Sequence, residues 1–161
     1  MGFTNTAAYF LTMLGAAQAA IVGVVPFKDT YNATATSAIT VTFTTAPTFV
    51  IREDYSIVFG VYPAGTLTSP AIGHRFANVD LVGRGLTSTG GGNATIKGLA
   101  LHSSDFIAGS GAYTIAAGVT SGNGVDLSVE VVVYTTPLQV LVSLRLRART
   151  RAGVRTVDCN T

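Results

Sequence analysis

The sequence is poor in charge and in residues with catalytic or metal-binding chemistry. Charged residues make up 11% of its 161 residues, against roughly 25% in an average soluble domain. It has no tryptophan, two histidines and one cysteine, Cys159. A single cysteine excludes an intrachain disulfide and leaves an interchain bridge or a free thiol, which we expect in a solvent-facing tail. Two distant histidines and eight scattered acidic residues do not form the clusters that metal sites require.

Motifs for catalysis are also missing. Residues 102–105 place a histidine, two serines and an aspartate in a row, but neighbours on a strand point to opposite faces, which argues against a catalytic triad. We expect His102 to be a polar residue at a strand end. The chain has no G-x-S-x-G motif and no glycine-rich phosphate loop. We therefore predict that the protein is not an enzyme and that it needs no cofactor.

Apolar residues are abundant by contrast. Hydrophobic residues make up 48% of the chain, and the mean hydropathy is +0.46. This composition excludes intrinsic disorder. It also gives a free monomer little charge to keep it soluble. We predict that much of the surface is covered by copies of the same chain, as a dimer or trimer, or by another protein.

The N-terminal segment is uncharged from Gly2 to Phe27. No basic residue precedes its apolar run, which argues against a signal peptide, and the polar residues that interrupt it argue against a membrane span. Residues 7–20 are rich in Ala, Leu and Met, which favour helix, and Thr4 or Asn5 can cap its start. We predict an N-terminal helix or arm over residues 1–26, with Tyr9, Phe10 and Leu14 at a partner interface.

Strand-forming residues dominate after Pro26. Turn signals, mostly glycine, proline, asparagine and aspartate, separate the candidate strands. Short strands at this spacing predict one mainly β domain over residues 27–161, an antiparallel β-sandwich or jelly roll. The candidate strands are residues 38–44, 48–52, 56–62, 75–82, 94–101, 112–116, 125–134, 138–149 and 154–157.

The strongest local pattern is a predicted hairpin of residues 125–134 and 138–149, with its turn at residues 135–137. In the first strand, Val129, Val131 and Val133 share one face and alternate with Ser128 and Glu130. Alternation with a period of two places one face of a strand in a core and the other outside.

An arginine stripe marks the second strand of this hairpin. Three interpretations remain open: a solvated face that protects a sheet edge, a docking face for carboxylates of a neighbouring subunit, and a nucleic-acid contact. We expect no nucleic-acid partner, because stacking aromatics and lysines are not evident beside the stripe. The interface residues predicted here are Arg145, Arg147, Arg149 and Arg151.

The opening of the chain, GFTNTAAYFLTMLG at residues 2–15, resembles the start of small tailed-phage virion proteins, and the Thr-, Ala-, Val- and Gly-rich remainder is similar to them in composition. The resemblance implies a capsid decoration (cement) protein of a bacteriophage. Such a protein would bind a major capsid or other virion protein, stabilise the lattice through buried area, and be assembled in the host cytoplasm. The alternatives are a phage tail, baseplate or fibre component, or a cell-surface adhesin or filament subunit.

Overall fold

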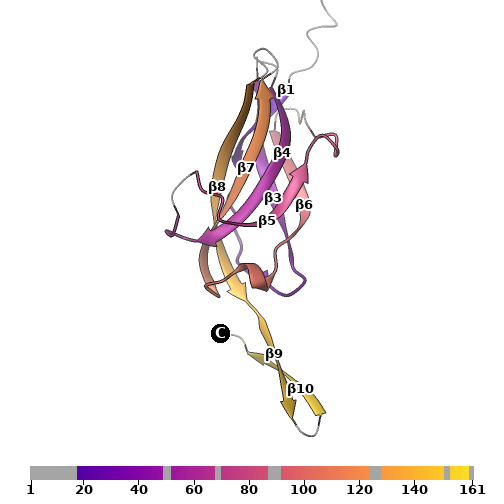
Figure 1. Cartoon of the computed structure of the whole chain (residues 1–161), viewed down its shortest axis with the longest axis vertical. Helices are drawn as coiled ribbons and strands as arrows, with labels where there is room; N and C mark the ends of the chain where they lie inside the picture. The colour runs from indigo at the N-terminus through magenta and orange to yellow at the C-terminus, as the bar shows by residue number, and fades with distance from the viewer. Residues whose placement is uncertain are drawn as a thin grey trace, which may run out of the picture.

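The computed structural model describes residues 18–48, 52–67, 70–86, 92–123, 128–150 and 153–159 (Figure 1). Most of these residues lie in strands, and one short 3-10 turn, η1, lies between β6 and β7. The elements are β1 (Gln18–Val24), β2 (Tyr31–Ala33), β3 (Ala38–Thr48), β4 (Arg52–Pro63), β5 (His74–Asp80), β6 (Gly92–Ala100), η1 (Ser103–Asp105), β7 (Gly111–Asn123), β8 (Ser128–Val142), β9 (Leu144–Thr150) and β10 (Gly153–Cys159).

The two larger sheets pack face to face. One has three strands in the order β1-β3-β6, and the other has five in the order β2-β8-β7-β4-β5. Figure 1 views the five-stranded sheet from its outer side, with the smaller sheet behind it. All neighbouring strands are antiparallel except β2 and β8. Strands β9 and β10 form a separate ribbon that extends beyond one end of the sandwich (Figure 1).

The core forms because apolar residues alternate along the facing strands. In β3, the inward residues Ile39, Val41 and Phe43 are buried and alternate with threonines, as expected for a strand with one face in a core. The Phe43 ring lies 6.0 Å from that of Phe59 on β4, which lies 6.0 Å from Phe76 on β5. These rings join the two sheets, and their packing supplies much of the apolar area that stabilises the sandwich.

The mainly β prediction is confirmed, but the N-terminal helix is not. Strand β1 begins at Gln18 and pairs with β3, so residues 18–20 of the predicted helix are strand. Ala19 and Ala20 are each 1% exposed. Small residues with high helix propensity can form a strand when pairing and burial favour it, because propensity is a weak preference. The rest of the predicted helix lies outside the described residues.

The predicted hairpin with its turn at residues 135–137 is wrong. Strand β8 runs through these residues without interruption and pairs with β7 from Ser128 to Val140. The main-chain N–H of Val142 points to the β7 side, where it donates to Ser110 Oγ. Successive residues of a strand direct their N–H groups to opposite sides. Pro137 is five residues before Val142, so its nitrogen faces away from β7. The proline therefore removes no hydrogen bond of this ladder.

Several residues between the predicted strands also lie inside strands. Glu53 and Asp54 belong to β4, Pro47 belongs to β3, and Ser121 belongs to β7. Cys159, expected in a loose tail, ends strand β10, where its main chain is opposite Leu144. Turn propensities are local, and pairing with long neighbouring strands overrides them here.

Candidate functional site

Strand β8 carries an apolar face that is turned to solvent. Val129 is 68% exposed and Val131 is 60% exposed. They lie opposite Gly122 and Thr120 of β7, on the outer side of the five-stranded sheet. The alternation predicted from the sequence is present, but at this end of β8 its apolar face is the one outside. Exposed large apolar side chains on one strand face are a feature of interaction surfaces.

The same strand has an open edge. Strand β2 pairs with β8 only at Val140–Val142, and within the described ranges no strand pairs with that edge over residues 128–139. The N–H of Ser143 donates to the Ala33 carbonyl of β2, so the odd-numbered residues of β8 direct their N–H and C=O groups to this side. Val129, Val131, Val133 and Thr135 therefore present main-chain groups to a further strand. An edge of this kind is a template for strand addition.

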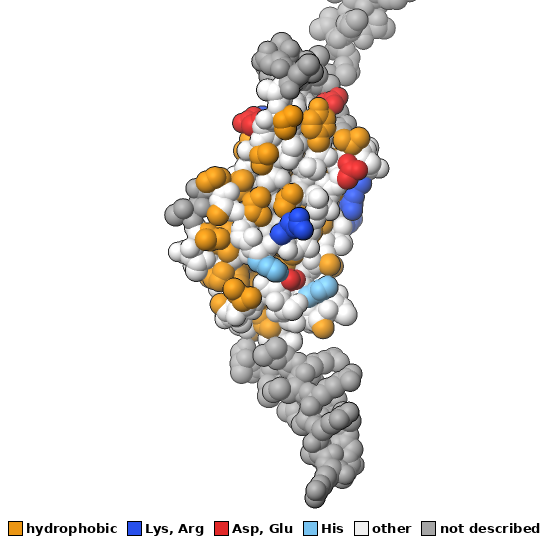
Figure 2. All heavy atoms as spheres, in the orientation of Figure 1, with side chains coloured by type: hydrophobic (Ala, Val, Ile, Leu, Met, Phe, Trp, Pro, Cys, Tyr) orange, Lys and Arg blue, Asp and Glu red, His pale blue; other side chains and the backbone are white. Residues whose placement is uncertain are grey.

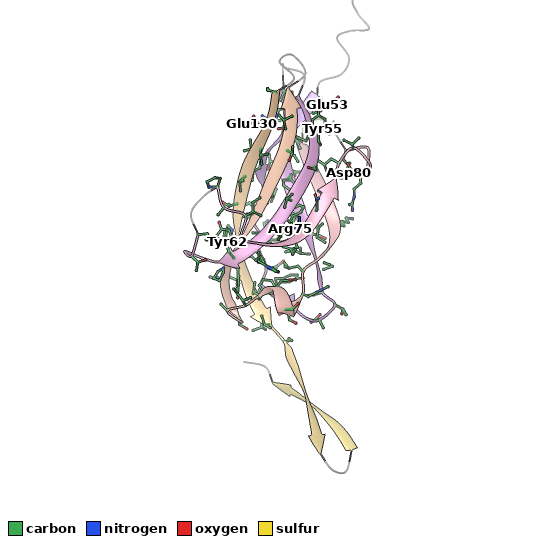
Figure 3. The ribbon with its side chains drawn as sticks, in the orientation of Figure 1. Glu53, Tyr55, Tyr62, Arg75, Asp80 and Glu130 are labelled. Atoms are coloured by element: carbon green, nitrogen blue, oxygen red, sulfur yellow. The ribbon has the colours of Figure 1, made fainter. Side chains whose placement is uncertain are left out.

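Small residues of β7 lie beside the open edge. Outward positions of β7 are small, among them Gly118, Thr120 and Gly122. The Tyr55 side chain of β4 lies against Gly122, where a Cβ atom would come within 2.5 Å of the Tyr55 hydroxyl oxygen. Hydrophobic side chains are spread over this side of the molecule with few charged ones between them (Figure 2). Tyr55 lies at the same end of the sandwich as Glu130 (Figure 3).

A polar cluster holds strand β1 at that end. Asp54, 2% exposed, accepts a hydrogen bond of 2.8 Å from the Ile21 N–H, and the Tyr134 hydroxyl donates to the Ile21 carbonyl. Burial raises the pKa of Asp54, and the Ile21 N–H and Arg52 lower it less strongly. Arg52 donates to Ser121 and lies 3.8 Å from Glu130. The Asp54 and Tyr134 side chains satisfy both main-chain groups of Ile21 and so close the edge of β1 at this residue. Among the described strands, none pairs with residues 128–139 of β8 on their open edge.

A pocket of about 290 Å³ lies between β4, the segment before β5, and η1. At its side the Nε2 atom of His74 is 3.3 Å from Oδ1 of Asp105. Oδ2 of Asp105 accepts a 2.7 Å hydrogen bond from the His102 N–H, which fixes the carboxylate. The row at residues 102–105 thus forms η1 and its cap, and His102 follows strand β6. The side-chain partner of Asp105 is His74, which is distant in sequence.

Of the predicted interface residues, three lie in the part of the chain that the structure describes. Tyr9, Phe10, Leu14 and Arg151 lie outside the described residues. The other three arginines lie on β9, where their main chains are opposite β10: Arg145 faces Asp158, Arg147 faces Thr156 and Arg149 faces Val154.

Two further kinds of feature are absent from the described residues. None of these residues form a cluster of histidine, cysteine and acidic side chains that could hold a metal ion. Nor does any helix in this part of the chain have the length and hydrophobicity to cross a membrane.

Comparison with known families gives one assignment. The model of the Nis1 family matches residues 17–139. The chain belongs to the Nis1 family. No curated protein matches the chain.

The Nis1 match separates the candidate sites from the arginine ribbon. Its range begins next to β1 and ends within β8, so it includes Val129, Val131 and the His74–Asp105 pair. The β9–β10 ribbon, with Arg145, Arg147 and Arg149, follows the matched range. The Nis1 part of the chain is therefore the sandwich with its open edge and pocket.

Proposed function

We propose that the protein is a non-catalytic interaction subunit that associates through the open edge and valine face of β8, with a second copy of itself as the first partner. The observation that carries this proposal is the combination of an unpaired edge with Val129 and Val131, both more than half exposed, on the same residues. Within the described residues, the His74 side chain has Asp105 as its hydrogen-bonding partner. This pair alone is not a catalytic triad, which also requires a nucleophile beside the histidine.

Charge and proline select one register for the pairing of two copies. Glu130 is the one charged side chain of β8, and like charges placed opposite each other disfavour a register. Pro137 has no N–H to offer, so pairing extends to Thr135. An antiparallel arrangement centred on Val132 satisfies both conditions. It places Val129 opposite the partner's Thr135 and Val131 opposite the partner's Val133.

This arrangement joins the two five-stranded sheets into one continuous sheet. A short strand pairing of this kind buries less than the roughly 1,200 Å² of the smallest stable interfaces, so we expect a concentration-dependent dimer with a micromolar dissociation constant. The twofold axis makes the interface isologous, with the same residues contributed by both copies. The main-chain hydrogen bonds supply affinity, and the valines supply apolar contact along the joint.

Disulfide formation tests the register. In a Cys159→Ser background, Val132→Cys places two sulfur atoms at the twofold axis, where opposed Cα atoms of a non-hydrogen-bonded pair lie roughly 4.5 Å apart. We expect a covalent dimer under mild oxidation. Val129→Cys is the matched control. Residue 129 is more exposed than residue 132, but in the proposed register it lies far from residue 129 of the partner. Equal cross-linking of both variants would contradict the proposed register.

Solution mass tests the association itself. Light scattering of the unmodified chain should give a mass that rises toward twice 16.6 kDa with concentration. Val131→Lys should remain monomeric, because a lysine at an edge opposes strand addition. Val82→Lys changes another exposed valine, 57% exposed, and should behave as the unmodified chain. A monomer at every concentration, or equal effects of both lysines, would overturn the proposal.

The setting of this association stays a prediction. A capsid decoration role in a virion would use such a dimer as a unit that bridges neighbouring lattice subunits, and a tail, adhesin or filament role would use the same edge. The jelly-roll-like connectivity likewise stays a prediction. The support for an interaction role comes from β8, whichever larger structure the subunit joins.

A further inference from the structure

The pocket beside η1 is a second surface, separate from the β8 edge. Its volume is about 290 Å³, and an engineered apolar cavity of about 150 Å³ is large enough to bind benzene. The pocket therefore has room for one aromatic ring. The buried residues Val61 and Tyr113 line it, together with Tyr62 and Pro63. No residue of β8 contributes to it, so its occupancy does not depend on the proposed dimer.

Two exposed apolar side chains border the same pocket. Ile107 is 83% exposed and Leu67 is 44% exposed, and both are among its lining residues. One exposed apolar side chain needs no explanation, but two that converge on a concave apolar surface favour a ligand that covers them.

One side of the pocket is polar and fixed. The Asp105 carboxylate is held by the His102 N–H through Oδ2 and lies within 3.3 Å of His74 through Oδ1. The Asp105 side chain is 18% exposed, against 56% for His74. A carboxylate accepts hydrogen bonds and, when ionised, donates none. The pair thus offers an acceptor at the edge of an apolar site, a combination that orients ligands with one hydrogen-bond donor.

We infer that this pocket binds a para-substituted phenol, with the ring against Val61, Leu67 and Ile107 and the hydroxyl group donating to the His74–Asp105 pair. The same chemistry is found in a free phenolic compound and in a tyrosine side chain of a peptide. This site goes beyond the proposed interaction function, because it is a ligand site on another part of the sandwich.

Titration of the full chain by ¹H–¹⁵N NMR tests the site, with 4-ethylphenol as the probe. We expect saturable shifts of the amide signals of Gly73, His74 and Ile107. The matched probe 4-ethylanisole has the same ring but no donor, and we expect roughly tenfold weaker binding for the loss of a hydrogen bond to a charged group. No saturable shift, or equal affinity for both probes, would overturn the inference.

Variants assign the contacts. Ile107→Ala removes apolar contact at an exposed position, so it should weaken the binding of 4-ethylphenol without affecting the fold. His74→Gln should reduce the preference for the phenol over the anisole. Arg75→Gln, next to His74 on β5, is the control and should change neither affinity. Equal loss in all three variants would count against the site, and the spectrum of each variant reports whether it is folded.

The two sources of the phenol are separated by N-acetyl-tyrosinamide. If N-acetyl-tyrosinamide binds as tightly as 4-ethylphenol and N-acetyl-phenylalaninamide binds much more weakly, the result supports the site and assigns it to a tyrosine side chain. Binding of 4-ethylphenol alone supports the site and assigns it to free phenolic compounds. Equal affinity of the tyrosine and phenylalanine amides would overturn the role of the hydroxyl group.

Discussion

The substitution Gly60→Ala probes the packing that positions the pocket. Gly60 lies on β4, on the outer side of the five-stranded sheet, under the segment that leads into His74. A Cβ atom at this position would be 2.0 Å from the main-chain oxygen of Ile72 and 2.5 Å from its Cγ2 atom. A main-chain atom cannot turn away, so the segment of residues 70–73 would have to lift from the sheet.

The expected cost follows from this geometry. Overpacking a well-packed site costs about 1–3 kcal/mol, and we expect the upper end, about 3 kcal/mol, because the obstacle is backbone. Gly122→Ala is the matched control on β7. Its added Cβ would meet the outer end of the Tyr55 side chain, which is 37% exposed and can rotate. We expect the free energy of unfolding to change by less than about 1 kcal/mol, since alanine also restricts the unfolded chain.

Urea unfolding measures both variants. Gly60→Ala should shift the midpoint to lower urea with an unchanged slope, which indicates a change in stability rather than in the surface exposed. The variant should also bind 4-ethylphenol more weakly, because Ile72 and Gly73 would move with the pocket wall. A Gly60→Ala variant as stable as Gly122→Ala would refute the reasoning, since the close approach of Ile72 would then carry no energetic cost.

Two further predictions concern the core and the buried carboxylate. Phe59→Ala should lower the free energy of unfolding by about 3–5 kcal/mol, because Phe59 is fully buried between two other rings; a loss under about 1 kcal/mol in urea unfolding would be incompatible with this packing. Burial raises the pKa of Asp54 above its ordinary value of 3.8, so the folded state binds its proton more tightly than the unfolded state. The corresponding stability is fully present below that ordinary value and is lost as pH rises through the folded pKa. Asp54→Asn should remove this decline, and an unchanged pH dependence of the urea midpoint would contradict the assignment.

The strands of the sandwich were largely predictable, and their limits were not. The strands at residues 38–44 and 56–62 were predicted from their strand-forming residues and the turn signals around them, and both segments lie inside observed strands. Strand β8 shows the limit of local signals. Its residues 135–137 read as a turn, but Pro137 is tolerated because its missing N–H points away from β7. That direction depends on the register with β7, which single-sequence patterns do not specify.

The candidate sites divide in the same way. The alternation of valines at residues 129–133 is evident in the sequence, but the face that meets solvent depends on which face of the larger sheet the smaller sheet covers. The arginine stripe was evident too, and its members Arg145, Arg147 and Arg149 lie on β9, after the Nis1 range. The contact of His74 with Asp105 spans 31 residues and has no local signal.

By itself the sequence determined the chemistry available to this protein: little charge, abundant apolar and β-branched residues, one cysteine, and alternation that makes strands. Apolar side chains on one face of a sheet must be buried, and a second sheet packed against that face buries them. Only the tertiary structure decided which strand edges were closed and which side chains met. Asp54 and Tyr134 close the edge of β1 at Ile21 while β8 stays open, and η1 brings Asp105 to His74. Such pairings arise from contacts between distant segments, which composition and periodicity cannot encode.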